Sequence, residues 1–64
     1  MIYDKIVEYC TNKGMSIMAF EKMCDLSNGT VGKWRDNKLN PSYDSIRKIV
    51  SATGIPFDEW AREE

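Results

Sequence analysis

Apolar residues recur at intervals of three and four along the chain, and no stretch alternates apolar and polar residues with a period of two. The first spacing lines one face of an α-helix, whereas a half-buried β-strand needs the second. Turn-forming residues break the pattern into five segments. The sequence therefore predicts an all-α fold of five short helices.

The ends of the first two helices follow from the residues around them. The first segment carries Ile2, Ile6 and Cys10 on one face. It stops at Gly14, which suits the left-handed position after a helix. Ser16 is the expected N-cap of the second helix, because a serine hydroxyl accepts a hydrogen bond from a free N–H group at the helix start.

The same signals place the remaining helices. Ser27 is the expected N-cap of the third helix, which a polar loop ends. A fourth helix begins at Ser42 or Tyr43 and stops at Gly54. Pro56 opens the last helix, since its missing N–H is not needed in a first turn.

Length and composition exclude most catalytic functions. The 64 residues form one predicted domain, residues 1–64, and a domain of this size buries only about 60% of the surface of its unfolded chain. A large active-site cavity is therefore not expected. Histidine, the commonest general base and metal ligand, is absent. We predict that the protein is not an enzyme and uses no cofactor, metal ion or small-molecule substrate.

The two cysteines indicate a reducing compartment. Cys10 and Cys24 can form at most one bridge, and a secreted chain of this size normally carries four to eight cysteines. We expect free thiols that fill the core. Residues 1–5 lack the features of a signal peptide, and no segment approaches the roughly 20 apolar residues of a membrane span. The sequence predicts a soluble cytoplasmic domain.

The most informative stretch is residues 16–34, in which two short, capped helices flank a tight turn. Its apolar residues, counted from Ile17, fall at positions four, eight, ten, fifteen and eighteen: Phe20, Cys24, Leu26, Val31 and Trp34. Helices with this spacing cross steeply and leave the second one on the surface, where it can enter a major groove. We predict a helix-turn-helix at about residues 16–36, with a recognition helix at about residues 28–36.

This stretch resembles the lambdoid repressor and Cro-type helix-turn-helix family, also called the xenobiotic-response-element-like (XRE) family. It looks closest to phage and plasmid regulators of Gram-positive bacteria. The resemblance is carried by a serine-capped helix followed by Leu26-Ser-Asn-Gly-Thr-Val-Gly-Lys-Trp34. Asn40-Pro41-Ser42 and the run from Gly54 to Trp60 are similar to the family's last two helices, so the resemblance covers essentially the whole chain. It implies a compact five-helix, lambda-repressor-like DNA-binding domain.

Three residues depart from the family's pattern. The family usually has a small residue where Glu21 stands and a glycine where Asp25 stands. The turn at Asp25 often needs a positive φ, which Asp accepts better than most residues. Ile17 stands where a glutamine often helps to hold a phosphate, so that contact would fall to backbone N–H groups.

The resemblance implies that base edges are read from the start of the third helix, by Asn28, Gly29, Thr30, Gly32 and Lys33. Asn can bond adenine and Lys can bond guanine. Alternatively, Asn28 serves the helix start and Lys33 is a solvated charge. Each glycine costs about 1 kcal/mol inside a helix. The presence of both Gly29 and Gly32 therefore has two possible explanations. Either the helix backbone approaches the duplex closely there, or the two positions are exposed and their residue type is under little constraint.

Charge is distributed unevenly although the net charge is -1. Residues 1–26 carry a net charge of -1, residues 27–48 carry +3, and residues 49–64 carry -3. The basic part coincides with the predicted DNA face, as phosphate binding requires. The expected phosphate contacts are Ser16, Ile17, Ser27, Lys38, Asn40, Ser42 and Tyr43.

The leading hypothesis is a sequence-specific regulator of transcription, a repressor that binds a two-fold double-stranded DNA operator as a homodimer. The expected dimer surface is Ile55, Phe57, Trp60 and Ala61. Alternatively, Phe57 and Trp60 close the core of one chain. Helical spacing assigns Trp34 and Trp60 to the core, against a role in stacking on single strands. The alternative function is an antitoxin-like or anti-repressor protein-interaction module. The length fits a complete Cro-like protein or an excised DNA-binding domain.

Overall fold

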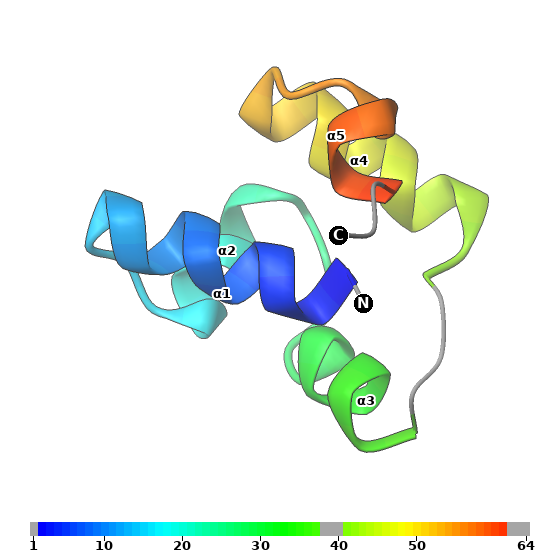
Figure 1. The fold of residues 1–64 in the computed structure, drawn as a ribbon. Coiled ribbons are helices and arrows are strands. Elements are labelled where there is room, and N and C mark those ends of the chain that lie inside the picture. The colour runs from blue at the N-terminus through cyan, green and yellow to red at the C-terminus, as the bar shows by residue number, and fades with distance from the viewer. Residues whose placement is uncertain (1, 38–40, 62–64) are drawn as a thin grey trace.

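The computed structural model describes residues 2–37 and 41–61, which form five α-helices (Figure 1). In chain order they are α1 (Ile2–Lys13), α2 (Ile17–Met23), α3 (Thr30–Asn37), α4 (Tyr43–Thr53) and α5 (Phe57–Ala61). Within the two described ranges, no residue lies in a β-strand. The prediction of an all-α fold with five helices is confirmed.

The first helix, α1, packs against three others. It contacts α2, α3 and α5, while α2 also packs against α3 and α4 packs against α5. Figure 1 shows α4 and α5 together on one side of α1, with α3 at the opposite end of the molecule. One side of α3 therefore faces the other helices and the other side faces solvent.

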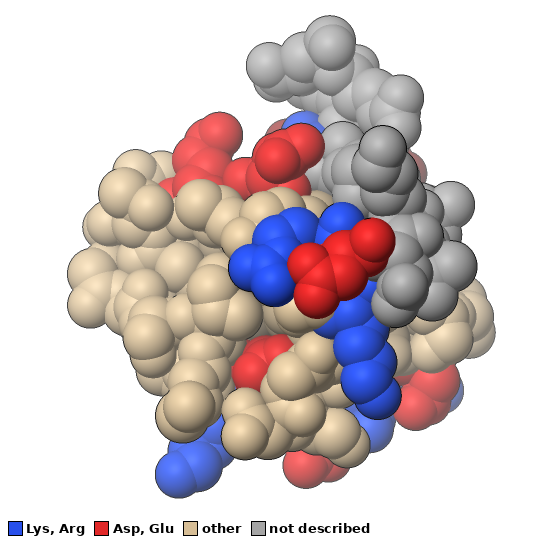
Figure 2. Space-filling view, turned by 90° about the horizontal axis from the view of Figure 1, so that it is seen from below, with Lys and Arg blue, Asp and Glu red and all other residues tan. Residues whose placement is uncertain are grey.

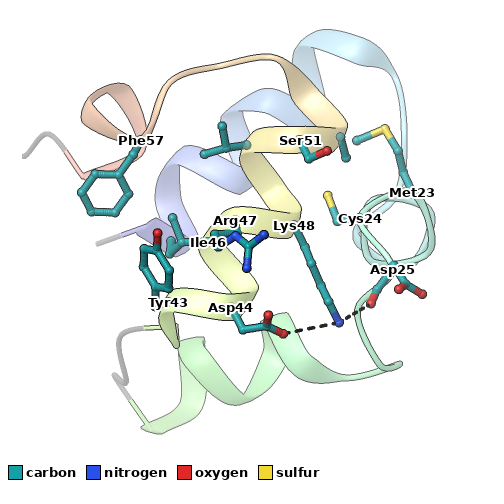
Figure 3. Close-up of a pocket in the computed structure, with 12 residues that line it drawn as sticks. Met23, Cys24, Asp25, Tyr43, Asp44, Ile46, Arg47, Lys48, Ser51 and Phe57 are labelled. Carbon is teal, nitrogen blue, oxygen red and sulfur yellow. Dashed lines mark hydrogen bonds and ion pairs between the residues drawn. The ribbon is translucent and has the colours of Figure 1, made fainter.

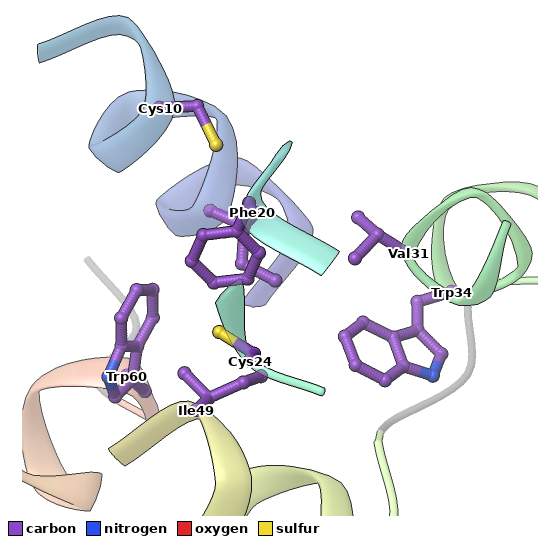
Figure 4. Close-up of a cluster of buried hydrophobic side chains, with 8 residues drawn as sticks. Cys10, Phe20, Cys24, Val31, Trp34, Ile49 and Trp60 are labelled. Atoms are coloured by element: carbon purple, nitrogen blue, oxygen red, sulfur yellow. The ribbon is translucent and has the colours of Figure 1, made fainter. Parts of the chain in front are cut away.

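An aromatic cluster joins helices that are far apart in the sequence. The ring centroid of Phe20 on α2 lies 5.7 Å from that of Tyr9 on α1 and 6.2 Å from that of Trp60 on α5, both edge to face. Figure 4 shows Phe20 and Trp60 next to each other in the core. Aromatic pairs at such distances contribute about 0.5–1.5 kcal/mol beyond the burial of their area.

Both tryptophans are buried, as their helical spacing predicts. Among the residues whose burial is described, the other buried apolar side chains are Ile6, Cys10, Phe20, Cys24, Val31, Ile46 and Ile49. The two cysteines are free thiols, and burial raises the pKa of Cys24 to about 11. They fill the core, as predicted.

Short-range hydrogen bonds cap the helices where the sequence indicates. The Ser16 hydroxyl accepts a hydrogen bond from the N–H of Ala19 at 3.1 Å, and the Ser42 hydroxyl accepts one from the N–H of Ser45 at 3.2 Å. Gly54 ends α4 with a φ of 73° and donates its N–H to the carbonyl four residues earlier. These caps fix the ends of α2 and α4.

The start of α3 differs from the prediction. The helix begins at Thr30, so Asn28 and Gly29 lie in the preceding turn and not in a recognition helix that starts at residue 28. Ser27 is not its N-cap. The backbone carbonyl of Ser27 instead accepts hydrogen bonds from the N–H of Thr30 at 3.1 Å and from its hydroxyl at 2.7 Å. The local serine pattern was misleading because a side chain from α2 bonds the start of α3.

The helices are short. The longest, α1, has 12 residues. In the part of the chain that the structure describes, no helix has both the length and the apolar character needed to cross a bilayer.

The turn after α2 contains a residue in the left-handed region. Asp25 has a φ of 60°, which agrees with its place at a family position that is often glycine. A non-glycine residue in this conformation costs about 1–2 kcal/mol, although Asp tolerates it better than most. The N–H of the next residue, Leu26, donates to the carbonyl of Glu21 at 2.8 Å, which closes the turn.

We expect Asp25→Gly to raise the free energy of unfolding by about 0.5–1 kcal/mol, because glycine relieves the strain at positive φ. Greater freedom of the unfolded chain offsets part of the gain. Gly54→Ala is the matched reverse change. A Cβ at Gly54 would meet no described atom within 4 Å, so its cost of about 1 kcal/mol comes from the backbone alone. Urea denaturation followed by circular dichroism measures the free energy of unfolding of both variants. A loss of stability in Asp25→Gly would show that the backbone at Asp25 is not strained.

Candidate nucleic-acid interface

The predicted base-reading residues lie together around the start of α3. Asn28 and Gly29 are exposed in the turn, and Lys33 is exposed in the first turn of the helix. Thr30 and Gly32 are half-buried between them. The hydroxyl proton of Thr30 is already donated to a backbone carbonyl of the turn, so its oxygen is left as an acceptor.

Side chains on the inner side of α3 determine which side of the helix faces solvent. Val31 and Trp34, one helical turn apart, are both buried in the core (Figure 4). The guanidinium of Arg35 lies 6.0 Å from the ring centroid of Tyr3 on α1, within the range of a cation–π contact. These contacts hold α3 against α1 and leave its opposite side open to a ligand.

A side chain from α2 caps the start of α3. The carboxylate of Glu21 accepts hydrogen bonds from the N–H of Gly29 at 3.2 Å and from the N–H of Val31 at 2.8 Å. Glu21 is only 3% exposed. The first N–H groups of a helix have no partner inside it, and a negative charge suits the positive end of its dipole. Glu21 therefore caps α3, which is the role that the serine pattern predicts for Ser27.

The need for a partner of Glu21 can be inferred from the sequence, although which partner it bonds cannot. Ile17, Glu21 and Cys24 follow the spacing of four and three that lines a buried helix face. A charged residue on such a face needs hydrogen-bond partners. The helix that follows the tight turn offers such partners, because its first N–H groups have no acceptor within the helix.

A second charged residue holds the same turn from α4. The Nζ of Lys48 donates a hydrogen bond to the backbone carbonyl of Asp25 at 3.3 Å and lies 3.8 Å from Oδ2 of Asp44 (Figure 3). Its positive charge therefore lies at the end of α2, where the helix dipole favours a cation. Part of the charge of Lys48 is thus engaged within the chain.

Gly29 and Gly32 occupy different conformations. Gly29 has a φ of 89°, in the region that favours glycine, so the turn itself explains it. Gly32 lies inside α3, and a Cβ added to it would meet no described atom within 4 Å. The fold therefore does not require a glycine at position 32. Because glycine has no side chain, the backbone of α3 is open to close approach at Gly32.

The predicted phosphate contacts have different surroundings. The hydroxyls of Ser16 and Ser42 are N-caps, at the starts of α2 and α4. Ile17 is half-buried and packs against the core, whereas the side chain of Tyr43 is 78% exposed. Ser27 lies exposed in the turn before α3. Two more of these predictions, Lys38 and Asn40, lie outside the described residues.

Basic side chains near α3 have acidic neighbours. The Nε of Arg35 donates a hydrogen bond to Oδ1 of Asp36 at 2.8 Å. This bond lowers the pKa of Asp36 and raises the pKa of Arg35. Figure 2 shows the molecule from the α3 side, with basic and acidic side chains next to each other and a wide area without charged groups. The described part of this face is therefore mixed in charge.

An open groove runs along α4, beside the predicted dimer surface. Tyr43 and Phe57 lie at one end of the groove and Met23 lies at the other, with Arg47 and Lys48 between them (Figure 3). The groove thus combines exposed apolar side chains with charged ones.

The predicted dimer residues fall into different environments. Trp60 is only 3% exposed, so its indole closes the core of a single chain and has little area left for a partner. Phe57 is 51% exposed and Ile55 is half-buried. Ala61 is the last residue of α5. Phe57 thus presents a large apolar side chain to solvent.

Comparison with known proteins agrees with this geometry. A family model described as helix-turn-helix matches residues 6–60, which include all of α2, α3, α4 and the turn capped by Glu21. No curated protein and no solved structure matches the chain significantly. The matched range covers most of the sequence, and the all-helical fold is consistent with it. The chain belongs to the Cro/C1-type, or XRE-type, helix-turn-helix family of DNA-binding regulators.

Proposed function

We propose that this protein binds a specific sequence of double-stranded DNA with the start of α3 in the major groove, and that it represses transcription as a homodimer on a two-fold operator. Family membership supports the DNA binding. The exposed start of α3 supports the docking mode. Asn28, Gly29 and Lys33 face solvent there, while Val31 and Trp34 anchor the opposite side of the helix in the core.

The exposed groups suit base edges. The amide of Asn28 can both donate to and accept from adenine, and the ammonium of Lys33 can donate to guanine. A bidentate contact contributes about 1–3 kcal/mol of discrimination, and lysine, a point donor, belongs at the lower end. The methyl group of Thr30 can meet a thymine methyl. With two glycines beside these residues, we propose that specificity is modest.

Phosphate contacts are proposed on both sides of this helix, since such contacts fix the orientation of a protein on the duplex. They would come from the turn before α3, from the starts of α2 and α4, and from the loop between α3 and α4. The proposed residues are those predicted from the sequence: Ser16, Ile17, Ser27, Lys38, Asn40, Ser42 and Tyr43.

A gel-shift or footprinting assay tests the proposal. The duplexes are the DNA upstream of the protein's own gene and a random library, measured over a salt series. Each phosphate neutralised should contribute about -0.9 to the slope of log affinity against log salt. The proposal would be wrong if the protein bound no duplex, or if its affinity for every duplex were independent of salt concentration. A stable complex with another protein in its place would favour the antitoxin-like module.

Lys33→Ala should flatten the preference at one base position, because only a base contact is lost there. The measurement compares the affinity of the variant for a set of sites that carry each base change in turn. Lys13→Ala is the control, since it removes the same charge from the last turn of α1. It should leave the preference at every position unchanged. A uniform loss across all sites in Lys33→Ala would assign Lys33 to a phosphate.

Gly32→Ala should raise the free energy of unfolding by up to about 1 kcal/mol, because alanine favours a helix and the added methyl meets no described atom. The same methyl should weaken binding to the selected duplex about tenfold if the backbone of α3 approaches the bases closely. Urea denaturation and fluorescence anisotropy measure the two effects. Thr11→Ala, on an exposed position of α1, is the control and should leave binding unchanged. Unaltered DNA affinity in Gly32→Ala would exclude the close approach.

A homodimer accounts for affinity that one small domain does not provide. A single module covers only about 600–1,000 Å² of its own surface on DNA. Two copies with recognition helices about 34 Å apart would meet successive major grooves. We place the contact at Phe57 and Ile55, next to the groove along α4, because Trp60 is occupied in the core.

Phe57→Asp should lower the fraction of dimer, because it puts a charge into an apolar contact, while leaving the fold intact because the side chain is half exposed. Analytical ultracentrifugation measures the association, and circular dichroism checks the fold. Met18→Asp is the matched control, since Met18 is also an exposed apolar residue but lies on α2. Equal association of Phe57→Asp and the unaltered chain would remove Phe57 from the interface.

A further inference from the structure

We propose that Glu21 is a positioning residue for DNA recognition, whose carboxylate sets the start of α3 and keeps a phosphate away from that helix end. The inference rests on the proposed function, because it concerns the same interface. Glu21 is buried, so it touches no DNA itself. It acts through the backbone of the turn and of the first residues of α3.

Both carboxylate oxygens take part. Oε1 accepts from the N–H of Gly29 at 3.2 Å, and Oε2 accepts from the N–H of Val31 at 2.8 Å. These residues lie on either side of Thr30, the first residue of α3. The two bonds therefore fix the end of the turn and the beginning of the helix relative to α2. Asn28 precedes Gly29 directly, so the same bonds restrict where its amide can lie.

The carboxylate also changes the electrostatics of the helix start. A helix normally offers free N–H groups and about half a positive charge to an anion. At α3, Glu21 occupies the N–H groups of Gly29 and Val31, and its negative charge offsets the dipole. A phosphate would therefore find little favourable interaction with the backbone at the start of α3. Side chains at the exposed start of α3, such as Lys33, therefore engage the duplex, whereas the backbone N–H groups of Gly29 and Val31 do not.

Glu21→Gln should change the affinity for two kinds of duplex differently. The amide has the shape of the carboxylate but one acceptor fewer, so one N–H at the start of α3 loses its partner. Affinity for a selected duplex should fall about tenfold, because the base-reading groups are no longer held in place. Affinity for a scrambled duplex should stay the same or rise, because a negative charge near the phosphates is removed. The ratio of the two affinities falls as a result.

The experiment uses a duplex that the unaltered protein enriches from a random library, together with a scrambled duplex of the same composition. Fluorescence anisotropy gives both affinities, at a temperature at which circular dichroism shows each variant fully folded. Glu8→Gln is the matched control, because it removes the same charge from an exposed position on α1 and should leave the ratio unchanged. If Glu21→Gln does not fold, the comparison is made with Asp25→Gly present in every protein.

Two results overturn the proposal. One is an equal loss for both duplexes, which indicates a purely structural role. The other is no change in either affinity. Amide hydrogen exchange by NMR adds a readout without DNA, since the N–H groups of Gly29 and Val31 should be protected in the unaltered chain and exchange faster in Glu21→Gln. If the protein enriches no duplex at all, the proposed function fails and the recognition role fails with it. Intact amide protection would then leave Glu21 as a cap only.

Discussion

The buried carboxylate of Glu21 determines how the two helices of the helix-turn-helix meet. An ionised group withdrawn from water costs several kcal/mol unless hydrogen bonds replace its hydration. Here the replacement comes from the N–H groups of Gly29 and Val31, and these reach the carboxylate only with the turn in its present shape. The side chain of Val31 points into the core, and Trp34 follows one helical turn later. Polar and apolar contacts therefore specify the same arrangement of α2 and α3.

The other helices depend on contacts across the molecule, because none is long enough to be stable alone. Isolated helices shorter than about 12–15 residues are marginal in water. α5 has five residues and is held through Trp60, which meets Tyr9 and Phe20. Lys48 of α4 bonds the carbonyl of Asp25, a contact between residues 23 positions apart. The tertiary contacts that position α3 and the turn before it are thus also those that keep the short helices folded.

Most of the fold could be predicted because helical spacing and caps are local signals. Spacing found the five helices and the burial of both tryptophans, and Ser16 and Gly54 marked helix ends correctly. The start of α3 could not be read locally, because its cap, Glu21, lies eight residues before the turn glycine that it bonds. Spacing also could not divide the apolar residues of α5 between the core and the surface, since this depends on how α5 lies against α1. The base-reading residues remain predictions, because specificity depends on a duplex that the chain alone does not contain.

Ion pairs on α3 and α4 affect how strongly the protein is attracted to DNA of any sequence. Arg35 lies 2.8 Å from Asp36 and Lys48 lies 3.8 Å from Asp44, and the whole chain has a net charge of -1. Attraction to DNA of any sequence comes from neutralising phosphates with basic side chains. Arg35 and Lys48 therefore share their charge with acidic neighbours and attract phosphates less than unpaired cations would. Under the proposed function, DNA of unselected sequence would retain such a protein weakly, so that fewer molecules would be withheld from the operator.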